Sequence, residues 1–176
     1  MSGARYVKMI VETLATRGER IVLAESCTGG LVTATLAKVP GVSEHLCGGM
    51  VTYRDATKEA WLDVPGRTLA RHSAVSEATA KAMVRGVLRA TPEATWGVSV
   101  TGHLGPHAPT SLDGLVFVAL ARRRSARRIE YLGCERYRLQ ATSRLKRRDE
   151  AVTLVLDLIA EVLDAAGRGT HQGRPR

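Results

Sequence analysis

The sequence predicts an α/β fold in which helices cover both faces of a mixed sheet. Three observations support this prediction. Strand and helix patterns alternate through the first two-thirds of the 176 residues, which implies right-handed helical crossovers between strands. Trp96–Thr101 is an almost continuous run of small apolar residues, as in a strand buried on both sides. A strand at Leu115–Ala121 leads almost directly into another at Arg128–Arg138, which makes this pair antiparallel.

Helical spacing of apolar residues, together with helix-capping residues, predicts five helices. They are Tyr6–Thr16, Thr28–Val39, a short helix that Asp55 caps and that ends before Pro65, an alanine-rich helix that follows Ser76–Thr79, and Ser143–Ala166. Gly18 ends the first helix and Pro40-Gly41 ends the second, because neither glycine nor proline continues a helix well.

Five apolar stretches predict strands. They are Arg20–Ala24, Leu46–Tyr53, Trp96–Thr101, Leu115–Ala121 and Arg128–Arg138. Gly48 and Gly49 in the second strand indicate that another backbone approaches it closely. The last strand alternates partly between apolar and polar residues, so we expect it to be less buried than the others.

The length of the chain is typical of one domain, which we place at residues 1–166, followed by a polar, disordered tail at 167–176. Cys27, Cys47 and Cys134 are odd in number and scattered, which indicates a reducing compartment and no disulfide framework. No apolar run approaches the roughly 20 residues that span a bilayer, and the N-terminus lacks a signal-peptide core. We therefore expect a soluble cytoplasmic protein without membrane contact.

The positive charge of the chain is concentrated in one segment. Eleven lysines and arginines lie between Arg122 and Arg148 against two acids, Glu130 and Glu135, so this segment carries a charge equal to the net charge of +9. Such a segment can bind nucleic acid, protect a sheet edge from aggregation or attract small anionic substrates. Because it carries few stacking aromatics and no known nucleic-acid signature, we expect nucleic-acid binding to be absent.

The stretch Glu25-Ser26-Cys27-Thr28-Gly29-Gly30 connects a predicted strand to a predicted helix. It places a serine in a tight turn beside unpaired N–H groups, which can hold an anion or a developing oxyanion. The alternative is that Ser26 or Thr28 only caps the helix while the glycines permit the turn. Cys27 is a rival nucleophile, since a helix start favours a thiolate, although small buried cysteines are more common.

Tyr53 and Lys58 follow the second predicted strand. A lysine beside a serine can serve as its general base if burial lowers the pKa of the amine toward neutrality, and a nearby tyrosine can relay a proton or orient the lysine. The alternative is an ordinary exposed lysine on a helix surface.

Taken together, these segments resemble the C-terminal domain family of CinA, which includes nicotinamide-nucleotide amidases. The matching segments lie in order between about residues 6 and 165. They are Leu23–Gly30, Val39–Ser43, Gly48–Tyr53 with Lys58, Leu62–Pro65, His72–Glu77 and Gly97–Gly102. The resemblance implies a three-layer α/β/α domain with a mixed, mostly parallel five-stranded sheet.

The resemblance also implies an activity. It is the hydrolysis of the carboxamide of nicotinamide mononucleotide to nicotinate mononucleotide and ammonia, without a metal or organic cofactor. By this resemblance Ser26 is the nucleophile, Lys58 is its base and Tyr53 assists. By the same resemblance we expect the chain to self-associate into a homo-oligomer.

We expect the oxyanion to be held by N–H groups around Thr28, Gly29 and Gly30. The residues expected to bind the substrate are Glu25, Thr28, Gly29, Gly30, Thr101, Gly102, Gly105 and Arg148. Arg144, like Arg148, occupies a position where the family carries arginines, and either arginine can instead be an ordinary charge on a helix surface.

The loop at 103–113 departs from the family pattern. Where the family carries a glycine run and then a lysine, this chain carries His107-Ala108-Pro109 and Ser111-Leu112-Asp113. Pro109 removes a backbone donor and Asp113 weakens the attraction for a phosphate, so the substrate cradle is altered. His103 and His107 either replace the lost anion ligands or have no role. The alternative function is therefore a diverged, non-catalytic domain that binds a nucleotide or a protein partner.

Overall fold

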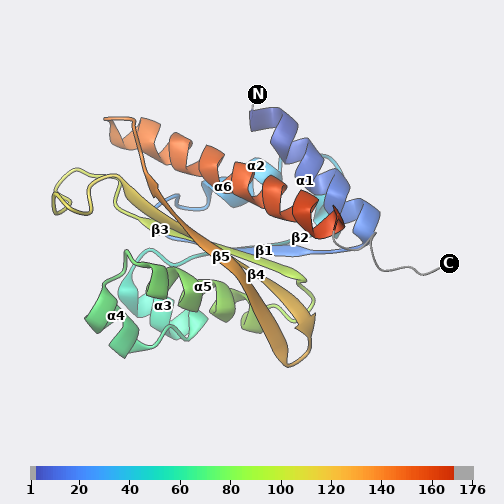
Figure 1. The fold of residues 1–176 in the computed structure, drawn as a ribbon, viewed down its shortest axis with the longest axis horizontal. Helices are drawn as coiled ribbons and strands as arrows, with labels where there is room; N and C mark the ends of the chain where they lie inside the picture. The colour runs from blue at the N-terminus through green and yellow to red at the C-terminus, as the bar shows by residue number, and fades with distance from the viewer. Residues whose placement is uncertain (1–2, 169–176) are drawn as a thin grey trace.

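The computed structural model describes residues 3–168 and shows a five-stranded sheet between two layers of helices (Figure 1). The strands are β1 (Ile21–Glu25), β2 (Leu46–Val51), β3 (Trp96–Gly102), β4 (Leu115–Ser125) and β5 (Arg128–Arg138). Their order across the sheet is β2-β1-β3-β4-β5. The three-layer α/β/α architecture implied by the family resemblance is therefore confirmed.

The sheet is mixed. β1 pairs in parallel with both β2 and β3, whereas β3–β4 and β4–β5 are antiparallel. The β4–β5 pair was predicted, and the β3–β4 pair was not. The loop at 103–114 returns the chain alongside β3 without a helical crossover, so the parallel pairs are confined to one side of the sheet.

Helices cover the two faces in separate groups (Figure 1). One face carries α1 (Gly3–Arg17), α2 (Leu31–Leu36) and α6 (Arg144–Arg168), and the other carries α3 (Asp55–Leu62), α4 (Gly66–His72) and α5 (Glu77–Ala90). A single-turn 3-10 helix at Val42–Glu44 precedes β2.

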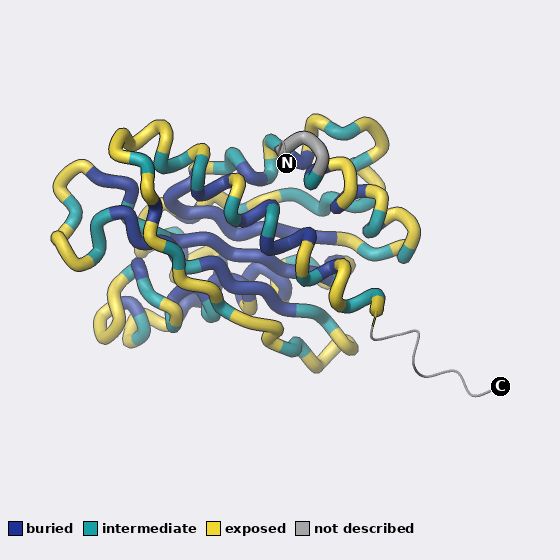
Figure 2. The backbone as a smooth tube through the Cα atoms, turned by 45° about the horizontal axis from the view of Figure 1, so that its top comes forward, coloured by how far each residue is buried: buried dark blue, intermediate teal, exposed yellow. Residues whose placement is uncertain are grey.

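Each face of the sheet packs against its own apolar cluster. Along β1, Ile21 and Leu23 belong to the cluster beneath α1 and α6, while Val22 and Ala24 belong to the cluster beneath α5. This alternation follows from the two-residue period of a strand. Figure 2 shows the resulting band of buried backbone through the centre of the molecule.

Several elements differ from their predicted bounds. α2 is only six residues long, because residues 27–30 and 37–38 form turns and not helix. α4 was not predicted, since Leu69 is its one buried residue and no apolar stripe marks it. α6 extends to Arg168, so the first two residues of the predicted tail are helical, and the remainder of that tail lies outside the described residues.

The close neighbour of Gly49 is a side chain and not the predicted backbone. A Cβ at this position would lie 2.2 Å from Thr33 Oγ1. Within residues 3–168, no helix has the length and apolar character needed to cross a membrane.

Candidate active site

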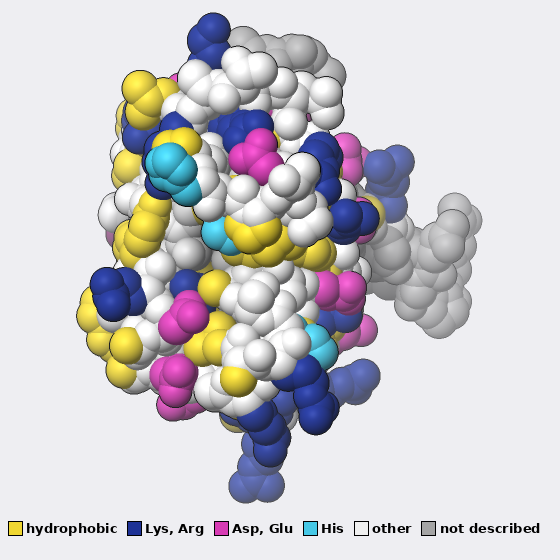
Figure 3. Space-filling view, turned by 90° about the vertical axis from the view of Figure 1, so that its left-hand side faces the viewer, with side chains coloured by type: hydrophobic (Ala, Val, Ile, Leu, Met, Phe, Trp, Pro, Cys, Tyr) yellow, Lys and Arg dark blue, Asp and Glu magenta, His cyan; other side chains and the backbone are white. Residues whose placement is uncertain are grey.

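The predicted catalytic groups gather where β1 and β3 end. A cavity of about 200 Å³ opens there, at the end of the molecule that Figure 3 shows. Its lining comes from the turn after β1, from α3, from the segments that follow β2 and β3, and from the start of α6. The lining residues are Ser26, Cys27, Tyr53, Lys58, Ala74, Val75, Thr101, Gly102, His103, Leu104, Gly105, Pro106 and Arg144.

Ser26 follows directly on the last residue of β1. Its N–H donates to the carbonyl of Val100 on the neighbouring strand at 3.0 Å, so the turn is tied to the sheet. Ser26 is buried but lines the cavity. The sheet therefore holds the backbone of Ser26 in place beside β3.

Glu25 holds the turn in place from inside the protein. Its fully buried carboxylate accepts five hydrogen bonds. Oε2 accepts from Thr28 Oγ1 at 2.7 Å and from the N–H groups of Gly30 and Val32. Oε1 accepts from both the N–H and the hydroxyl of Thr33. Glu25 thus caps α2 from the preceding strand, and neither Ser26 nor Thr28 is the residue that caps this helix.

The N–H groups around Ser26 differ in availability. Those of Gly29 and Gly30 are bound to the Ser26 carbonyl and to Glu25, so the expectation that they hold an oxyanion is wrong for this conformation. Within the described residues, the N–H groups of Cys27 and Thr28 donate to no other residue, although the Cys27 N–H interacts with its own thiol. The candidate oxyanion donors are therefore the two residues that follow the serine directly.

Lys58 is a buried lysine on α3, with 1% of its surface exposed, so the alternative of an exposed helix lysine is excluded. Its Nζ donates to the carbonyl of Thr52 at 3.1 Å and lies 3.6 Å from Oδ1 of Asp55. Burial lowers the pKa of the amine, while the Asp55 carboxylate opposes this shift. Lys58 and Ser26 line the same cavity, but no hydrogen bond joins them in the described chain.

Cys27 is the adjacent rival nucleophile, and its surroundings disfavour that role. The side chain is buried in the core beneath α1 and α6. Burial raises the pKa of the thiol to about 12, so the thiolate that would attack a carbonyl is scarce near neutral pH.

Tyr53 and Arg144 form the outer wall of the cavity. The Arg144 guanidinium donates to the Tyr53 hydroxyl at 2.5 Å and also to the carbonyl of Gly105. The start of α6 is thereby joined to the segment after β2 and to the loop after β3. This places one cation at the mouth of the cavity.

The predicted substrate-binding residues divide into two groups. Thr101, Gly102 and Gly105 line the cavity. Glu25, Thr28, Gly29, Gly30 and Arg148 do not line it. The first four of these build the turn, and the guanidinium of Arg148 lies against the carboxylate of its neighbour Asp149. Arg144, not Arg148, reaches the cavity, although both arginines follow the same pattern in the sequence.

A second cavity of about 430 Å³ adjoins the first and shares Leu104, Gly105, Pro106 and Arg144 with it. The loop at 103–113 forms its wall and is anchored to α6. Both Asp113 oxygens accept from Arg147 at 2.7 Å, which lowers the pKa of that carboxyl. The acidic charge that replaces the family lysine is therefore paired with a cation.

The histidines of this loop lie in different places. His103 lines the cavity at Ser26 and His107 lines the adjoining one. Sequence reasoning left open whether these histidines replace lost anion ligands or have no role. It did not select Ala74, Val75 or Arg144 as site residues, although the matching segment His72–Glu77 pointed to the first two.

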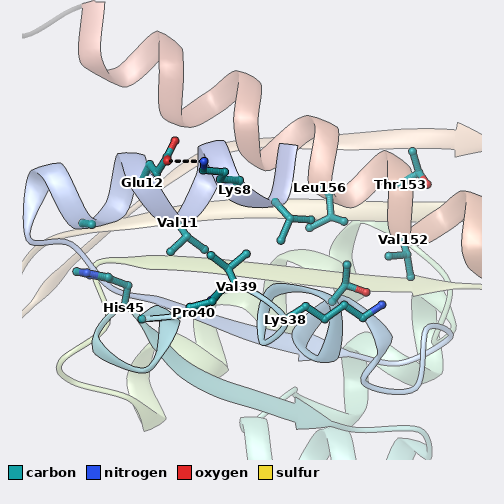
Figure 4. A pocket seen from close by; sticks show the side chains of 14 residues that line it. Lys8, Val11, Glu12, Lys38, Val39, Pro40, His45, Val152, Thr153 and Leu156 are labelled. Atoms are coloured by element: carbon teal, nitrogen blue, oxygen red, sulfur yellow. Dashed lines mark ion pairs between the residues drawn. The ribbon is translucent and has the colours of Figure 1, made fainter. Parts of the chain in front are cut away.

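A larger cavity of about 920 Å³ lies elsewhere, between α1, the segment after α2, and α6 (Figure 4). Apolar side chains such as Val11, Val39 and Leu156 dominate it, and Lys8 pairs with Glu12 at its rim. None of the predicted site residues lines it within the described chain, so we do not place the chemistry there. The described residues also contain no group of three or more histidine, cysteine or acidic side chains arranged to hold a metal ion.

Comparison with known proteins gives one consistent family. The model of the CinA C-terminal domain matches residues 4–163. A CinA-like protein from Myxococcus xanthus is 48% identical over 118 residues, which is 66% of this chain and 28% of the relative, and one from Anaeromyxobacter is 50% identical over 115 residues. The chain thus spans little more than a quarter of the length of these relatives.

Solved structures match over nearly the whole chain. The competence damage-inducible protein A of Klebsiella pneumoniae is 30% identical with a TM-score of 0.83, and the alignment covers 93% of this chain and 98% of that one. The competence/damage inducible protein of Agrobacterium tumefaciens is 29% identical with the same TM-score, over 93% of this chain and 99% of that one.

Proposed function

The chain belongs to the CinA C-terminal domain family, and we propose that it is an amidohydrolase that converts nicotinamide mononucleotide to nicotinate mononucleotide and ammonia. The observation that carries this proposal is the buried amine of Lys58 in the same small cavity as the Ser26 hydroxyl. A serine needs a base to attack an amide, and a desolvated lysine can be that base.

In the proposed reaction, Ser26 Oγ attacks the carboxamide carbon while neutral Lys58 takes the hydroxyl proton. The tetrahedral intermediate carries its negative oxygen toward the N–H groups of Cys27 and Thr28. As the C–N bond breaks, Lys58 returns the proton to the departing ammonia. Water activated by the same amine then hydrolyses the ester on Ser26, releasing nicotinate mononucleotide and restoring the hydroxyl.

The absence of a Ser26–Lys58 hydrogen bond among the described residues does not exclude the mechanism. Hydrogen bonds between catalytic groups are often long without substrate and tighten when the substrate is bound. Lys58 Nζ donates to the Thr52 carbonyl in this conformation, so in the proposed mechanism it turns from that carbonyl toward Ser26 Oγ.

The two adjoining cavities support the placement of a nucleotide. The smaller one, next to Ser26, suits the pyridine ring and its carboxamide. The larger one is open to the ribose and the phosphate, with Arg144 at the boundary as a phosphate donor. In this arrangement Tyr53, which bonds to Arg144, assists by linking the two parts of the site.

A second candidate function is nucleotide binding without hydrolysis. Two observations favour it: the changed loop at 103–113, and the absence of a Ser26–Lys58 hydrogen bond among the described residues. Such a protein would bind nicotinamide mononucleotide without releasing ammonia.

One assay separates these candidates. Purified protein is incubated with nicotinamide mononucleotide, and ammonia release is followed for wild type, Ser26→Ala, Lys58→Ala and the matched control Cys27→Ser. We expect activity in wild type and in the control, and a loss of at least about 10³-fold in the other two variants. Calorimetric binding by wild type without ammonia above the Ser26→Ala background would replace the amidohydrolase by the binding domain.

A further inference from the structure

A third cavity, of about 670 Å³, lies at the opposite end of the sheet from Ser26, where β3 begins. It is formed between the C-terminal half of α5 and the turn that joins β4 to β5, at the lower right of Figure 1. Its lining residues are Arg85, Arg89, Pro92, Arg123, Ala126, Arg127, Arg128, Ile129 and Tyr131. Five of these nine residues are arginines, and we call the site the arginine cavity.

No aspartate or glutamate lines the arginine cavity. Of the nearby acids, Glu130 pairs with Arg124 and Glu93 lies 3.7 Å from Arg20, while Asp63 lines the adjoining cavity that Arg85 and Arg89 also reach. Within residues 3–168, Arg85, Arg89, Arg127 and Arg128 form no ion pair, so their positive charges are not offset by carboxylates of this part of the chain.

Arg123 gives the cavity a fixed wall. Its guanidinium donates to the carbonyls of Ala94, Leu88 and Thr91 at and beyond the C-terminal end of α5. On the other side, the Tyr131 hydroxyl donates to the carbonyl of Lys81 at 3.3 Å. These contacts hold β4 and β5 against α5, so the fold fixes Arg123 and the backbone positions from which the other arginines extend.

Several unpaired guanidinium groups around one cavity repel one another and attract anions. A guanidinium presents a planar set of donors that matches phosphate oxygens. The arginines come from α5, β4, the β4–β5 turn and β5, and they surround a volume larger than one phosphate group. A ligand with several linked phosphates therefore satisfies them better than a single anion.

We propose that the arginine cavity binds the phosphate chain of a small polyphosphate, either inorganic or attached to a nucleoside. This site is separate from the proposed amidohydrolase site and does not depend on it. The exposed ring of Tyr131 forms one wall, on which the base of a nucleoside polyphosphate can stack.

The test measures binding of inorganic tripolyphosphate by calorimetry, with ATP and a 20-residue oligothymidylate as comparison ligands. Wild type is compared with Arg85→Gln/Arg128→Gln and with the control Arg67→Gln/Arg71→Gln, which removes the same charge from exposed positions on α4. Circular dichroism establishes that all three proteins are folded. Titrations at low and moderate salt show how far screening weakens the contact.

We expect micromolar binding of tripolyphosphate by wild type and by the control, and at least about tenfold weaker binding by Arg85→Gln/Arg128→Gln. If ATP binds more tightly than tripolyphosphate, the ligand of the cavity is a nucleoside polyphosphate. If the two bind equally, the ligand is inorganic polyphosphate. Equal losses in both double variants would overturn the proposal, because net charge alone would then explain the affinity. Binding of the oligonucleotide without binding of tripolyphosphate would overturn it in favour of a nucleic-acid surface.

Discussion

Burial changes the acid–base behaviour of Lys58, whose pKa lies below the ordinary value of a lysine. A lysine is rarely fully buried, because removing its charge from water is costly. Here the amine keeps one carbonyl partner, Thr52, and one nearby carboxylate, Asp55. Burial lowers its pKa and Asp55 raises it, so the exposed carboxylate on the same helix adjusts the pH at which the amine becomes neutral.

A substitution of Asp55 tests this balance. A general base must be neutral, so the rate rises as the pH passes upward through the pKa of Lys58. Asp55→Asn removes the influence that raises this pKa, and the acidic limb of the profile of kcat/KM against pH should therefore move to lower pH. The measurement is ammonia release from nicotinamide mononucleotide across pH for wild type and variant.

The control is Asp63→Asn at the other end of α3. It removes the same charge, and its left-handed backbone (φ 51°) accepts asparagine readily. We expect its profile to match that of wild type. An unchanged limb in Asp55→Asn, or the same shift in both variants, would show that Asp55 does not adjust the amine.

At the scale of the element, the turn between β1 and α2 depends on a residue outside the helix. A six-residue helix is too short to be stable by itself. Glu25, which belongs to β1, accepts hydrogen bonds from the N–H groups of Val32 and Thr33 in the first turn of this helix. The same carboxylate also accepts from the hydroxyls of Thr28 and Thr33. The serine is therefore positioned by a buried acid and not by the helix that follows it.

Glu25→Gln should lower the free energy of unfolding by about 2–3 kcal/mol, because an amide replaces a carboxylate that accepts five hydrogen bonds. The catalytic rate should fall as well, since the Ser26 turn loosens. Urea unfolding and kinetics of ammonia release measure the two effects, with the exposed substitution Glu44→Gln as control. If Glu25→Gln unfolded like that control but raised KM, direct substrate contact by Glu25 would be the better explanation.

At the scale of the whole molecule, sequence patterns were most reliable where local chemistry decides the structure. The strand Trp96–Thr101 and the helix after Ser76 were predicted because each has its own apolar pattern or cap. α4 and the antiparallel pairing of β3 with β4 depend on contacts with distant segments, and no local pattern of residues marks either.

The candidate site shows the same division. The positions of Ser26, Tyr53 and Lys58 were marked by family motifs, and all three line one cavity. The sequence could not show that the Gly30 N–H donates to Glu25 and the Gly29 N–H to the Ser26 carbonyl inside the turn. It also could not distinguish Arg144 from Arg148, because only the orientation of α6 decides which arginine faces the loop.

Arg147 connects that loop to the last helix, and its removal should affect substrate binding more than chemistry. Arg147→Gln leaves Asp113 as an unpaired negative charge beside the cavity assigned to the phosphate and loosens the cavity wall. Ser26 and Lys58 are held by other elements. We therefore expect KM for nicotinamide mononucleotide to rise about tenfold while kcat stays within about twofold of wild type.

The double variant Arg147→Gln/Asp113→Asn separates the two causes. It removes the unpaired carboxylate, so KM should fall part of the way back if repulsion of the phosphate matters. Arg148→Gln is the matched control, since this neighbouring arginine lies against Asp149 and outside both cavities. If KM rose as much for Arg148→Gln as for Arg147→Gln, the result would support the original prediction that Arg148 binds the substrate. The contact between Arg147 and the loop at 103–113 would then not explain the effect on KM.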